Sequence, residues 1–282
     1  MNKVDQYAVF GHPIGHSKSP RIHGLFARQT GEAIAYQAED VPAEEFVSRA
    51  NRFFGEGGRG LNCTIPLKEL AWEYVDSLSE RARLAKAVNT LARQTDGSIL
   101  GENTDGIGLL NDLTINNGIA VSRKNILILG AGGATRGIIP PLLEQQPTKL
   151  VIVNRTVERA KSIVDDFAGL GTLEAADYSS LRGEAFDLVI NATSASLSGQ
   201  LPPLFPSLLA DGGSCYDLAY ANQATAFVEW GIANRAVHSL DGLGMLVEQA
   251  AEAFYIWRGI RPDTATVIQT LDAERQARFG EP

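Results

Sequence analysis

A glycine-rich turn between two apolar runs constrains the fold of this chain more than any other feature. Residues 125–137 read NILILGAGGATRG, an apolar run that leads into glycines and then into the start of a helix. A second apolar run, LVIVN, follows at 150–154. Strands that are apolar throughout are covered by helices on both faces, so these segments predict a parallel α/β sheet. A glycine turn between such a strand and a helix is also typical of a dinucleotide-binding loop.

This loop is an imperfect copy of the dinucleotide-binding pattern G-x-G-x-x-G. Gly130 permits a tight turn, and Gly132 lets backbone N–H groups approach a pyrophosphate at the N-terminus of the helix. The third glycine is replaced by Thr135, so Gly133 and Ala134 are expected to be the small residues that pack the helix against the sheet. The alternative interpretation is a glycine turn that serves only the close packing of helix and sheet.

The end of the second apolar run indicates which dinucleotide the loop holds. An acidic residue usually stands there and accepts hydrogen bonds from the ribose of NAD. Asn154 takes this position without a charge, and Arg155 offers a planar guanidinium for bidentate contact with a phosphate. Thr156 adds a hydroxyl, and Arg159 lies one turn along the next helix. The stretch therefore favours NADP(H), the alternative being two solvated arginines at a sheet edge.

Composition and charge exclude several classes of function. The chain has 282 residues and a net charge of −8, so its overall charge favours neither nucleic acid nor an anionic membrane as a partner. Basic residues gather in 123–161, an island that suits a small polyanion but equally fits solvated surface charge. No apolar run approaches the roughly 20 residues of a membrane span, and the N-terminus lacks a secretory signal. These features predict a cytoplasmic protein with no membrane partner.

Cysteines and N-x-T triplets point the same way. Cys63 and Cys215 have no metal-ligand spacing, so we expect two reduced thiols and no metal. N-x-T triplets end apolar strand-like runs at Asn62, Asn154 and Asn191. Without secretion these triplets are not glycosylation sites, and their position requires another explanation.

Short apolar runs alternate with helical patterns along the whole chain, which predicts α/β architecture with a mostly parallel sheet in the N-terminal part. Strands are expected at 7–11, 33–40, 60–65, 88–93, 98–103, 125–130, 150–154, 187–193, 214–220 and near 237–238, with 88–93 and 98–103 paired across a turn. Helices are expected at 19–31, 43–58, 106–117, 132–145, 156–167 and 242–258, with one more at the C-terminal end.

Small polar residues stand where strands and turns of the first hundred residues end. Asn and Thr are poor choices for a strand interior but good ligands for a hydroxylated substrate. Each alone is more often a cap or turn residue, and two serines before a helix are natural caps. Together in one domain they favour a binding site for a carboxylate and several hydroxyls. The residues are Ser17, Ser19, Asn62, Thr64, Asn89 and Thr104.

Lys68 is the candidate for proton transfer. It follows Pro66 at the start of a helix, where a cation is unfavourable against the helix dipole. Asp105 is its natural carboxylate partner, and a Lys–Asp pair can supply the proton that a ketone needs when it is reduced by hydride. A surface salt bridge is the alternative. Gln249 lies among apolar residues at helical spacing, so its amide is expected to point inward and to need a partner.

Seven motifs, in this order, resemble the shikimate dehydrogenase family in its NADP-dependent form, and the resemblance runs from Tyr7 to about Pro262. The motifs are S-x-S-P-x-x-H (17–23), N-x-T-x-P-x-K (62–68), A-V-N-T-L (87–91), N-T-D-G (103–106), G-A-G-G-A (130–134), N-R-T (154–156) and G-x-G-M-L-x-x-Q (242–249). Cys63 and Leu218 depart from the family pattern, which more often has Val and Met at these positions.

The resemblance implies reduction of 3-dehydroshikimate to shikimate, in the chorismate route to aromatic amino acids. It implies that Ser17 and Ser19 hold the substrate carboxylate and that Lys68, with Asp105, is the acid–base group. Substrate hydroxyls would contact Asn62, Thr64, Asn89, Asp105 and Gln249, and Tyr220 matches another position that contacts substrate. The implied cofactor-binding residues are Gly130, Ala131, Gly132, Gly133, Ala134, Asn154, Arg155, Thr156, Arg159, Leu218 and Gly242.

The fold implied by the resemblance is two α/β domains that flank a cleft. Residues 1–105 with 241–282 would form the substrate-binding domain, and 106–240 a Rossmann-type NADP-binding domain. A quinate/shikimate dehydrogenase that accepts NAD is the nearest alternative, and a catalytically silent ligand sensor is another. Loss of Lys68 or Asp105 would favour the sensor, and both residues are present. A monomer and a homodimer both remain open.

Overall fold

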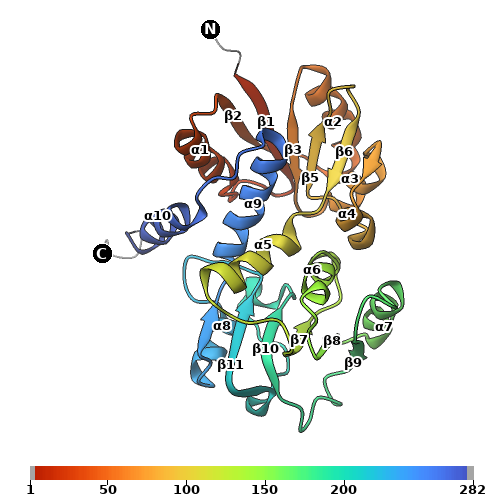
Figure 1. Cartoon of the computed structure of the whole chain (residues 1–282), viewed down its shortest axis with the longest axis vertical. Coiled ribbons are helices and arrows are strands. Elements are labelled where there is room, and N and C mark those ends of the chain that lie inside the picture. The colour runs from red at the N-terminus through yellow and green to blue at the C-terminus, as the bar shows by residue number, and fades with distance from the viewer. Residues whose placement is uncertain (1–3, 278–282) are drawn as a thin grey trace. The chain divides into compact units, whose positions relative to one another are not determined.

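The structure is a computed structural model of the chain, and it describes residues 4–277 (Figure 1). By backbone proximity the chain groups into two compact units. The first is Met1–Gly108 with Val247–Ala273, and the second is Leu109–Leu246 with Glu274–Pro282. The assignment of 1–105 with 241–282 to substrate and of 106–240 to NADP stays a prediction.

The first unit is built on a six-stranded sheet in the order β2-β1-β3-β5-β6-β4. Its strands are β1 Asp5–Gly11, β2 Ile34–Asp40, β3 Gly60–Cys63, β4 Ser77–Leu78, β5 Thr90–Arg93 and β6 Ile99–Glu102. β1 pairs in parallel with β2 and β3, and β4 with β6, whereas β5 runs antiparallel to β3 and β6. The expected pairing across the turn at Gly97 is confirmed, and its φ of 92° explains the glycine.

Helices cover this sheet where the apolar periodicity predicts them. They are α1 Ser19–Thr30, a 3₁₀ turn Ala43–Glu45, α2 Phe46–Gly55, α3 Lys68–Tyr74, α4 Glu80–Ala85, α9 Leu243–Arg258 and α10 Thr264–Ala277. α1 ends at Gly31, which has a φ of 72° and donates its N–H to the carbonyl of Ala27. Phe46 and Ala50 of α2 are fully buried and pack into the core beside Phe10 and Leu61.

The second unit contains a six-stranded sheet in which every pair is parallel. Its order, β12-β11-β10-β7-β8-β9, is that of a doubly wound dinucleotide-binding fold, and Figure 1 shows β11, β10, β7, β8 and β9 side by side. The strands are β7 Asn125–Leu129, β8 Lys149–Val153, β9 Leu173–Ala176, β10 Phe186–Asn191, β11 Leu209–Asp217 and β12 His238–Leu240. The helices are α5 Asp105–Asn111, which begins in the first unit, α6 Gly133–Glu144, α7 Val157–Asp166 and α8 Ala226–Ala233, with 3₁₀ turns at Ala195–Ser198 and Pro206–Leu208.

Two details of the second unit differ from the sequence prediction. β11 starts at Leu209 and not at 214, although the segment Asp211-Gly212-Gly213 has the composition of a turn. The helix expected over 106–117 is α5 followed by a π-helical turn, Asp112–Asn116. Asp112 is buried there and accepts a hydrogen bond from the Tyr216 hydroxyl at 2.6 Å, which is a tertiary contact that no local pattern predicts.

Within residues 4–277, no helix combines the length and the apolar character that crossing a membrane requires.

His23 of α1 is a fully buried histidine in the first unit. Its ring is stacked on Tyr36, with centroids 4.1 Å apart and planes 9° from parallel, and it meets Phe26 edge to face. Neither ring nitrogen has a hydrogen-bond partner. Burial therefore lowers the pKa of His23 from 6.5 to about 3, and the ring is neutral near pH 7.

This neutral histidine should make the first unit less stable in acid. Because the unfolded chain takes up the proton below pH 6.5 and the folded chain only near pH 3, stability falls as the pH drops through this window. The contribution is up to about 1.4 kcal/mol per pH unit. We expect His23→Leu to flatten the dependence of the unfolding free energy on pH between 6.5 and 4.5, measured by urea titration.

The control for this experiment is His16→Leu, which changes an exposed histidine of the same unit. It should keep the pH dependence of the wild-type protein. Equal slopes for His23→Leu and wild type would show that His23 is not the buried neutral group inferred here.

Candidate active site

Lys68 and Asp105 form an ion pair that is mostly shielded from water. Lys68 is the first residue of α3, and Asp105 is the first residue of α5. The Nζ atom lies 2.5 Å from Oδ2 of Asp105, and the side chains are 24% and 11% exposed. A solvated surface salt bridge would be far more exposed, so the structure favours the proton-transfer interpretation of this pair. The partner carboxylate also accounts for a lysine at a helix start.

The carboxylate of Asp105 is held from its other side by Asn89. The Nδ2 group of Asn89 donates to Oδ1 of Asp105 at 2.8 Å and to Oγ1 of Thr104 at 2.9 Å. Its Oδ1 atom accepts the backbone N–H of Thr104 at 2.9 Å. The Oε1 atom of Gln249 reaches 3.4 Å from Oγ1 of Thr104, so the amide of α9 points inward as its helical spacing predicts. The orientation of Asp105 toward Lys68 is therefore set by buried hydrogen bonds.

Asn62, at the end of β3, extends this network. Its Nδ2 group donates to the backbone carbonyl of Asn89 at 3.0 Å and to Oγ1 of Thr90 at 2.9 Å. The Thr90 hydroxyl donates in turn to Oδ1 of Asn89 at 3.0 Å. Thr90 is fully buried and links the two amides, yet the sequence reasoning did not single it out. Its place directly after Asn89 was the only signal.

The two serines lie at the start of α1. Oγ of Ser17 accepts the backbone N–H of Ser19 at 3.3 Å, so a capping role applies to Ser17 alone. Ser19 is buried and its side chain hydrogen-bonds to Tyr36. Thr64 follows β3, and its backbone N–H donates to Phe10 at 2.9 Å. The first unit thus contains all eight predicted residues other than Tyr220 that were assigned to substrate and catalysis: Ser17, Ser19, Asn62, Thr64, Lys68, Asn89, Asp105 and Gln249.

The glycine loop of the second unit has the geometry that its sequence predicts, with one correction. Gly130 has a φ of 104°, and a Cβ there would lie 3.1 Å from the carbonyl oxygen of Ala192. Gly132 precedes α6, and a Cβ on Gly132 or Gly133 would meet no atom within 4 Å. This open backbone at a helix N-terminus fits a pyrophosphate.

The prediction that Gly133 and Ala134 pack the helix against the sheet is wrong. Both residues are exposed, whereas Thr135 is fully buried. Thr135 also donates its hydroxyl to the carbonyl of Gly130 at 2.8 Å. The residue that replaces the third glycine therefore does the packing, because its hydroxyl finds a partner within the turn. Ala131 lies between the two loop glycines and is partly exposed.

The strand end after β8 presents two arginines to solvent. Asn154 folds the turn by donating from Nδ2 to the carbonyl of Thr156 at 2.9 Å. Arg155, Thr156 and Arg159 are exposed, and among the described residues neither arginine side chain has a hydrogen-bond or ion-pair partner. A guanidinium pair of this kind fits the phosphate of NADP.

Three other basic residues of the same island are neutralised by carboxylates. Lys124 pairs with Asp187 at 3.0 Å, and Lys149 pairs with Glu184 at 2.8 Å. Arg136 of α6 pairs with an aspartate of α7 at 2.5 Å. The island of positive charge is therefore concentrated by these pairs on the end of β8.

Leu218, Tyr220 and Gly242 lie after the adjacent strands β11 and β12. A Cβ on Gly242 would collide with the carbonyl oxygen of Leu218, so only glycine fits beside that residue. Tyr220 is largely buried, and burial raises the pKa of its hydroxyl, which stays protonated near pH 7. These three residues belong to the second unit, as does the glycine loop.

Asn191, at the end of β10, is a residue whose role the sequence left unexplained. Its Nδ2 group donates to Oδ1 of Asp217 at 3.1 Å, and its Oδ1 atom accepts the Thr193 hydroxyl at 2.7 Å. The N-x-T triplet at this position is therefore a buried turn beside the glycine loop. Burial raises the pKa of the Asp217 carboxyl, which receives several hydrogen bonds in compensation.

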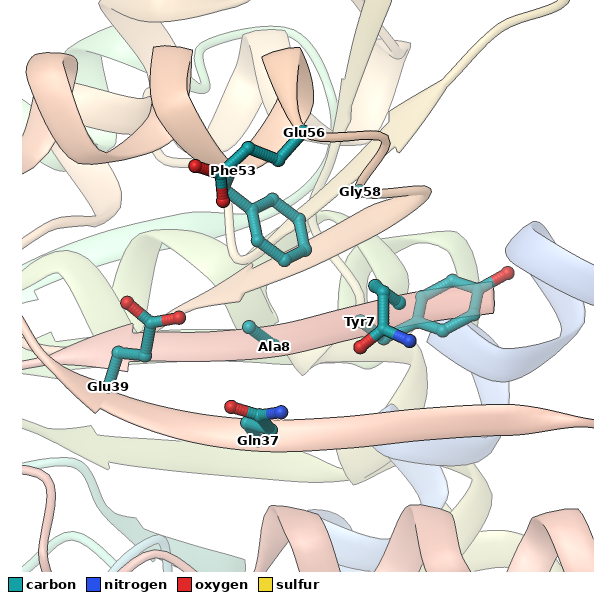
Figure 2. Close-up of a pocket in the computed structure, with 8 residues that line it drawn as sticks. Tyr7, Ala8, Gln37, Glu39, Phe53, Glu56 and Gly58 are labelled. Atoms are coloured by element: carbon teal, nitrogen blue, oxygen red, sulfur yellow. The ribbon is translucent and has the colours of Figure 1, made fainter. Parts of the chain in front are cut away.

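A separate hollow of about 230 Å³ lies over β1 and β2 beside α2 (Figure 2). None of the residues that line it is a predicted site residue, and its carboxylate Glu39 is paired with Arg49. Among the described residues there is also no group of three or more His, Cys, Asp or Glu side chains that could hold a metal. The chemistry is therefore concentrated on the Lys68 network and the glycine loop.

An open glycine loop in a parallel sheet of this order, and a shielded Lys–Asp pair that can move a proton, define a dinucleotide-dependent oxidoreductase. Comparison with known proteins agrees. Sequence profiles match at residues 9–91 (shikimate dehydrogenase substrate binding domain), 114–198 (shikimate/quinate 5-dehydrogenase) and 242–271 (shikimate 5′-dehydrogenase C-terminal domain). The chain belongs to the shikimate dehydrogenase family.

Individual relatives cover nearly the whole chain. It is 61% identical over 276 residues to shikimate dehydrogenase (NADP(+)) of Methylococcus capsulatus, which covers 98% of this chain and 99% of the relative. An Ael1 enzyme from Pseudomonas putida has a similar crystal structure, with a TM-score of 0.90, 46% identity, and 95% and 98% coverage. Shikimate 5-dehydrogenase from Thermus thermophilus, in complex with NADP(H) and shikimate, gives 0.84, 32%, and 94% and 98%.

Proposed function

We propose that this chain is a shikimate dehydrogenase that reduces 3-dehydroshikimate to shikimate with NADPH, and catalyses the reverse reaction with NADP⁺. The observation that carries the proposal is the shielded contact of 2.5 Å between Lys68 and Asp105, held by Asn89. Its membership of the family, at 61% identity to a relative named shikimate dehydrogenase (NADP(+)), supports the choice of substrate and cofactor.

The Lys68–Asp105 pair is the proton donor in this proposal. NADPH, when bound, supplies the hydride that the ketone carbon accepts. The ketone oxygen gains negative charge as this happens, and the pair delivers the proton that converts it into the hydroxyl of shikimate. In the reverse direction the pair takes up that proton. Asp105 keeps the Nζ group of Lys68 oriented, and Asn89 keeps Asp105 in place.

The remaining polar side chains of the first unit bind and orient the substrate. Ser17 and Ser19, at the N-terminus of α1, hold its carboxylate, where the helix dipole also favours a negative charge. The amides and hydroxyls bind the substrate hydroxyls. These residues are Asn62, Thr64, Asn89 and Gln249, with Tyr220 contributed by the second unit.

The second unit holds NADP(H). Backbone N–H groups of the loop from Gly130 to Ala134 bind the pyrophosphate, and Arg155 with Arg159 binds the 2′-phosphate beside Asn154 and Thr156. Leu218 and Gly242 form the surface against the nicotinamide. The open loop and the two unpaired arginines support this assignment.

Activity on quinate with NAD is the alternative within the family, because one matching profile covers shikimate and quinate dehydrogenases. The uncharged Asn154 at the strand end argues against NAD. A silent ligand sensor has no use for a shielded Lys–Asp pair. We further propose a cytoplasmic location, since Cys63 and Cys215 are both free and buried, and a monomer or homodimer as the working form.

Replacing Lys68 tests the catalytic proposal. We expect Lys68→Met to lower kcat for shikimate oxidation by roughly 10²-fold or more, because the proton loses its carrier. The dissociation constant for shikimate should change by less than about threefold, since other side chains bind the substrate. Steady-state kinetics and calorimetric titration measure the two quantities.

Lys124→Met is the matched control, because it also breaks a Lys–Asp pair but lies in the second unit away from the glycine loop strand end. It should retain the wild-type kcat. An unchanged kcat in Lys68→Met would remove Lys68 from the proton-transfer role.

Replacing the arginines tests the cofactor proposal. We expect Arg155→Ala and Arg159→Ala each to raise KM for NADPH by about 10-fold or more, as for a lost charge-assisted hydrogen bond. KM for NADH should stay constant, because NADH has no 2′-phosphate. Lys161→Ala, another exposed cation on α7, is the control and should change neither value.

The same assay compares the cofactors and substrates directly. Equal kcat/KM for NADPH and NADH in the wild-type protein would contradict the choice of NADP. Faster oxidation of quinate than of shikimate would favour the alternative activity.

A further inference from the structure

The hydroxyl of Tyr36 joins two residues that the proposed function assigns to different groups of the substrate. Tyr36 lies in β2 and Asn62 in β3, and β1 runs between these strands. The Tyr36 hydroxyl nevertheless donates to Oδ1 of Asn62 at 2.6 Å, so its side chain reaches across β1. The same hydroxyl hydrogen-bonds to the side chain of Ser19 at the start of α1.

These contacts determine which part of Asn62 is open to a ligand. Both Nδ2 hydrogens are used, one for the carbonyl of Asn89 and one for Oγ1 of Thr90. Oδ1 has two lone pairs, and Tyr36 takes one of them. Asn62 can therefore only accept a hydrogen bond from a substrate hydroxyl, along the direction that the Tyr36 contact leaves free.

The ring of Tyr36 is itself held in place by aromatic neighbours. His23 is stacked on it at 4.1 Å between centroids, and Trp257 of α9 lies at 6.2 Å with its plane tilted by 41°. Burial raises the pKa of the Tyr36 hydroxyl well above 10, so it stays a donor throughout the neutral range. The stacked His23 has no polar partner and acts through its ring face alone.

We infer that Tyr36 is a positioning residue for substrate, whose hydroxyl fixes the separation and orientation of Ser19 and Asn62. Ser19 would bind the carboxylate and Asn62 a ring hydroxyl, so Tyr36 sets the distance between the two groups that the site accepts. The inference rests on the proposed function, because it concerns the binding of shikimate. Tyr36 itself touches neither substrate nor cofactor in this arrangement.

Tyr7 supplies a control of unusual closeness. It stands directly opposite Tyr36 in the parallel pairing of β1 and β2. Its ring is also packed against Trp257, at 4.7 Å, and Figure 2 shows it directed from β1 toward α9. Its hydroxyl, however, lies 3.4 Å from Arg258 and meets no predicted site residue. Tyr7→Phe and Tyr36→Phe therefore remove the same atom from neighbouring buried rings.

The experiment compares these two variants with wild type in shikimate oxidation by NADP⁺. Tyr36→Phe keeps the ring stack on His23 and should raise KM for shikimate by about 10-fold, as expected when one organising hydrogen bond is lost. Its kcat should stay within about threefold of wild type, and KM for NADP⁺ should not change. Tyr7→Phe should leave all three constants at their wild-type values.

A double-mutant cycle separates positioning from general loss of structure. If Tyr36 acts through Asn62, Asn62→Ala should raise KM for shikimate less in the Tyr36→Phe background than in wild type. Additive effects on KM would overturn the inference, as would a wild-type KM in Tyr36→Phe. A change of KM for NADP⁺ equal to that for shikimate would reveal a merely structural role and also overturn it.

Failure of the proposed function gives a different result. A wild-type protein that does not oxidise shikimate would overturn both proposals. Wild-type activity with no specific effect of Tyr36→Phe would overturn only the role of Tyr36.

Discussion

Hydrogen bonding of two buried amides is the interaction on which the first unit depends. Asn62 and Asn89 are both shielded from water, so every N–H and oxygen left unpaired would cost about 1–3 kcal/mol. The structure pays this cost nowhere along the chain of contacts through Thr90, Thr104 and Asp105. The network therefore has a single arrangement, and that arrangement fixes where Lys68 places its charge. Folding energy and the geometry of proton transfer come from the same bonds.

The second unit uses charge in the opposite way. Lys124 and Lys149 are paired with carboxylates near the sheet, whereas Arg155 and Arg159 face solvent without a carboxylate in the described part of the chain. An exposed unpaired guanidinium costs little in water, because solvent screens it. Leaving these two charges unpaired keeps them available for an anion. This selective pairing is an observation that the sequence, with its even spread of basic residues over 123–161, does not contain.

Much of the fold follows from the sequence because periodicity reports burial on one or both faces. The apolar runs at β7 and β8 and the Gly97 turn are local signals, and the structure agrees with them. β9 was missed, since a short strand such as Leu173–Ala176 at the sheet edge is only half buried and has no apolar run. The role of Thr135 was also missed, because its buried hydroxyl is satisfied by a carbonyl that only the three-dimensional turn brings near.

The candidate site divides along the same line. Lys68, Asn89 and Asp105 stand at the ends of elements, where a polar residue is conspicuous, and sequence reasoning found them. Tyr36 lies within a strand, where an aromatic residue indicates core packing and nothing more. Its significance depends on the register that puts β1 between β2 and β3 and lets one hydroxyl reach both Ser19 and Asn62. Side chains that bind a ligand are thus visible in sequence as exceptions, whereas side chains that position them look ordinary until their neighbours across the sheet are known.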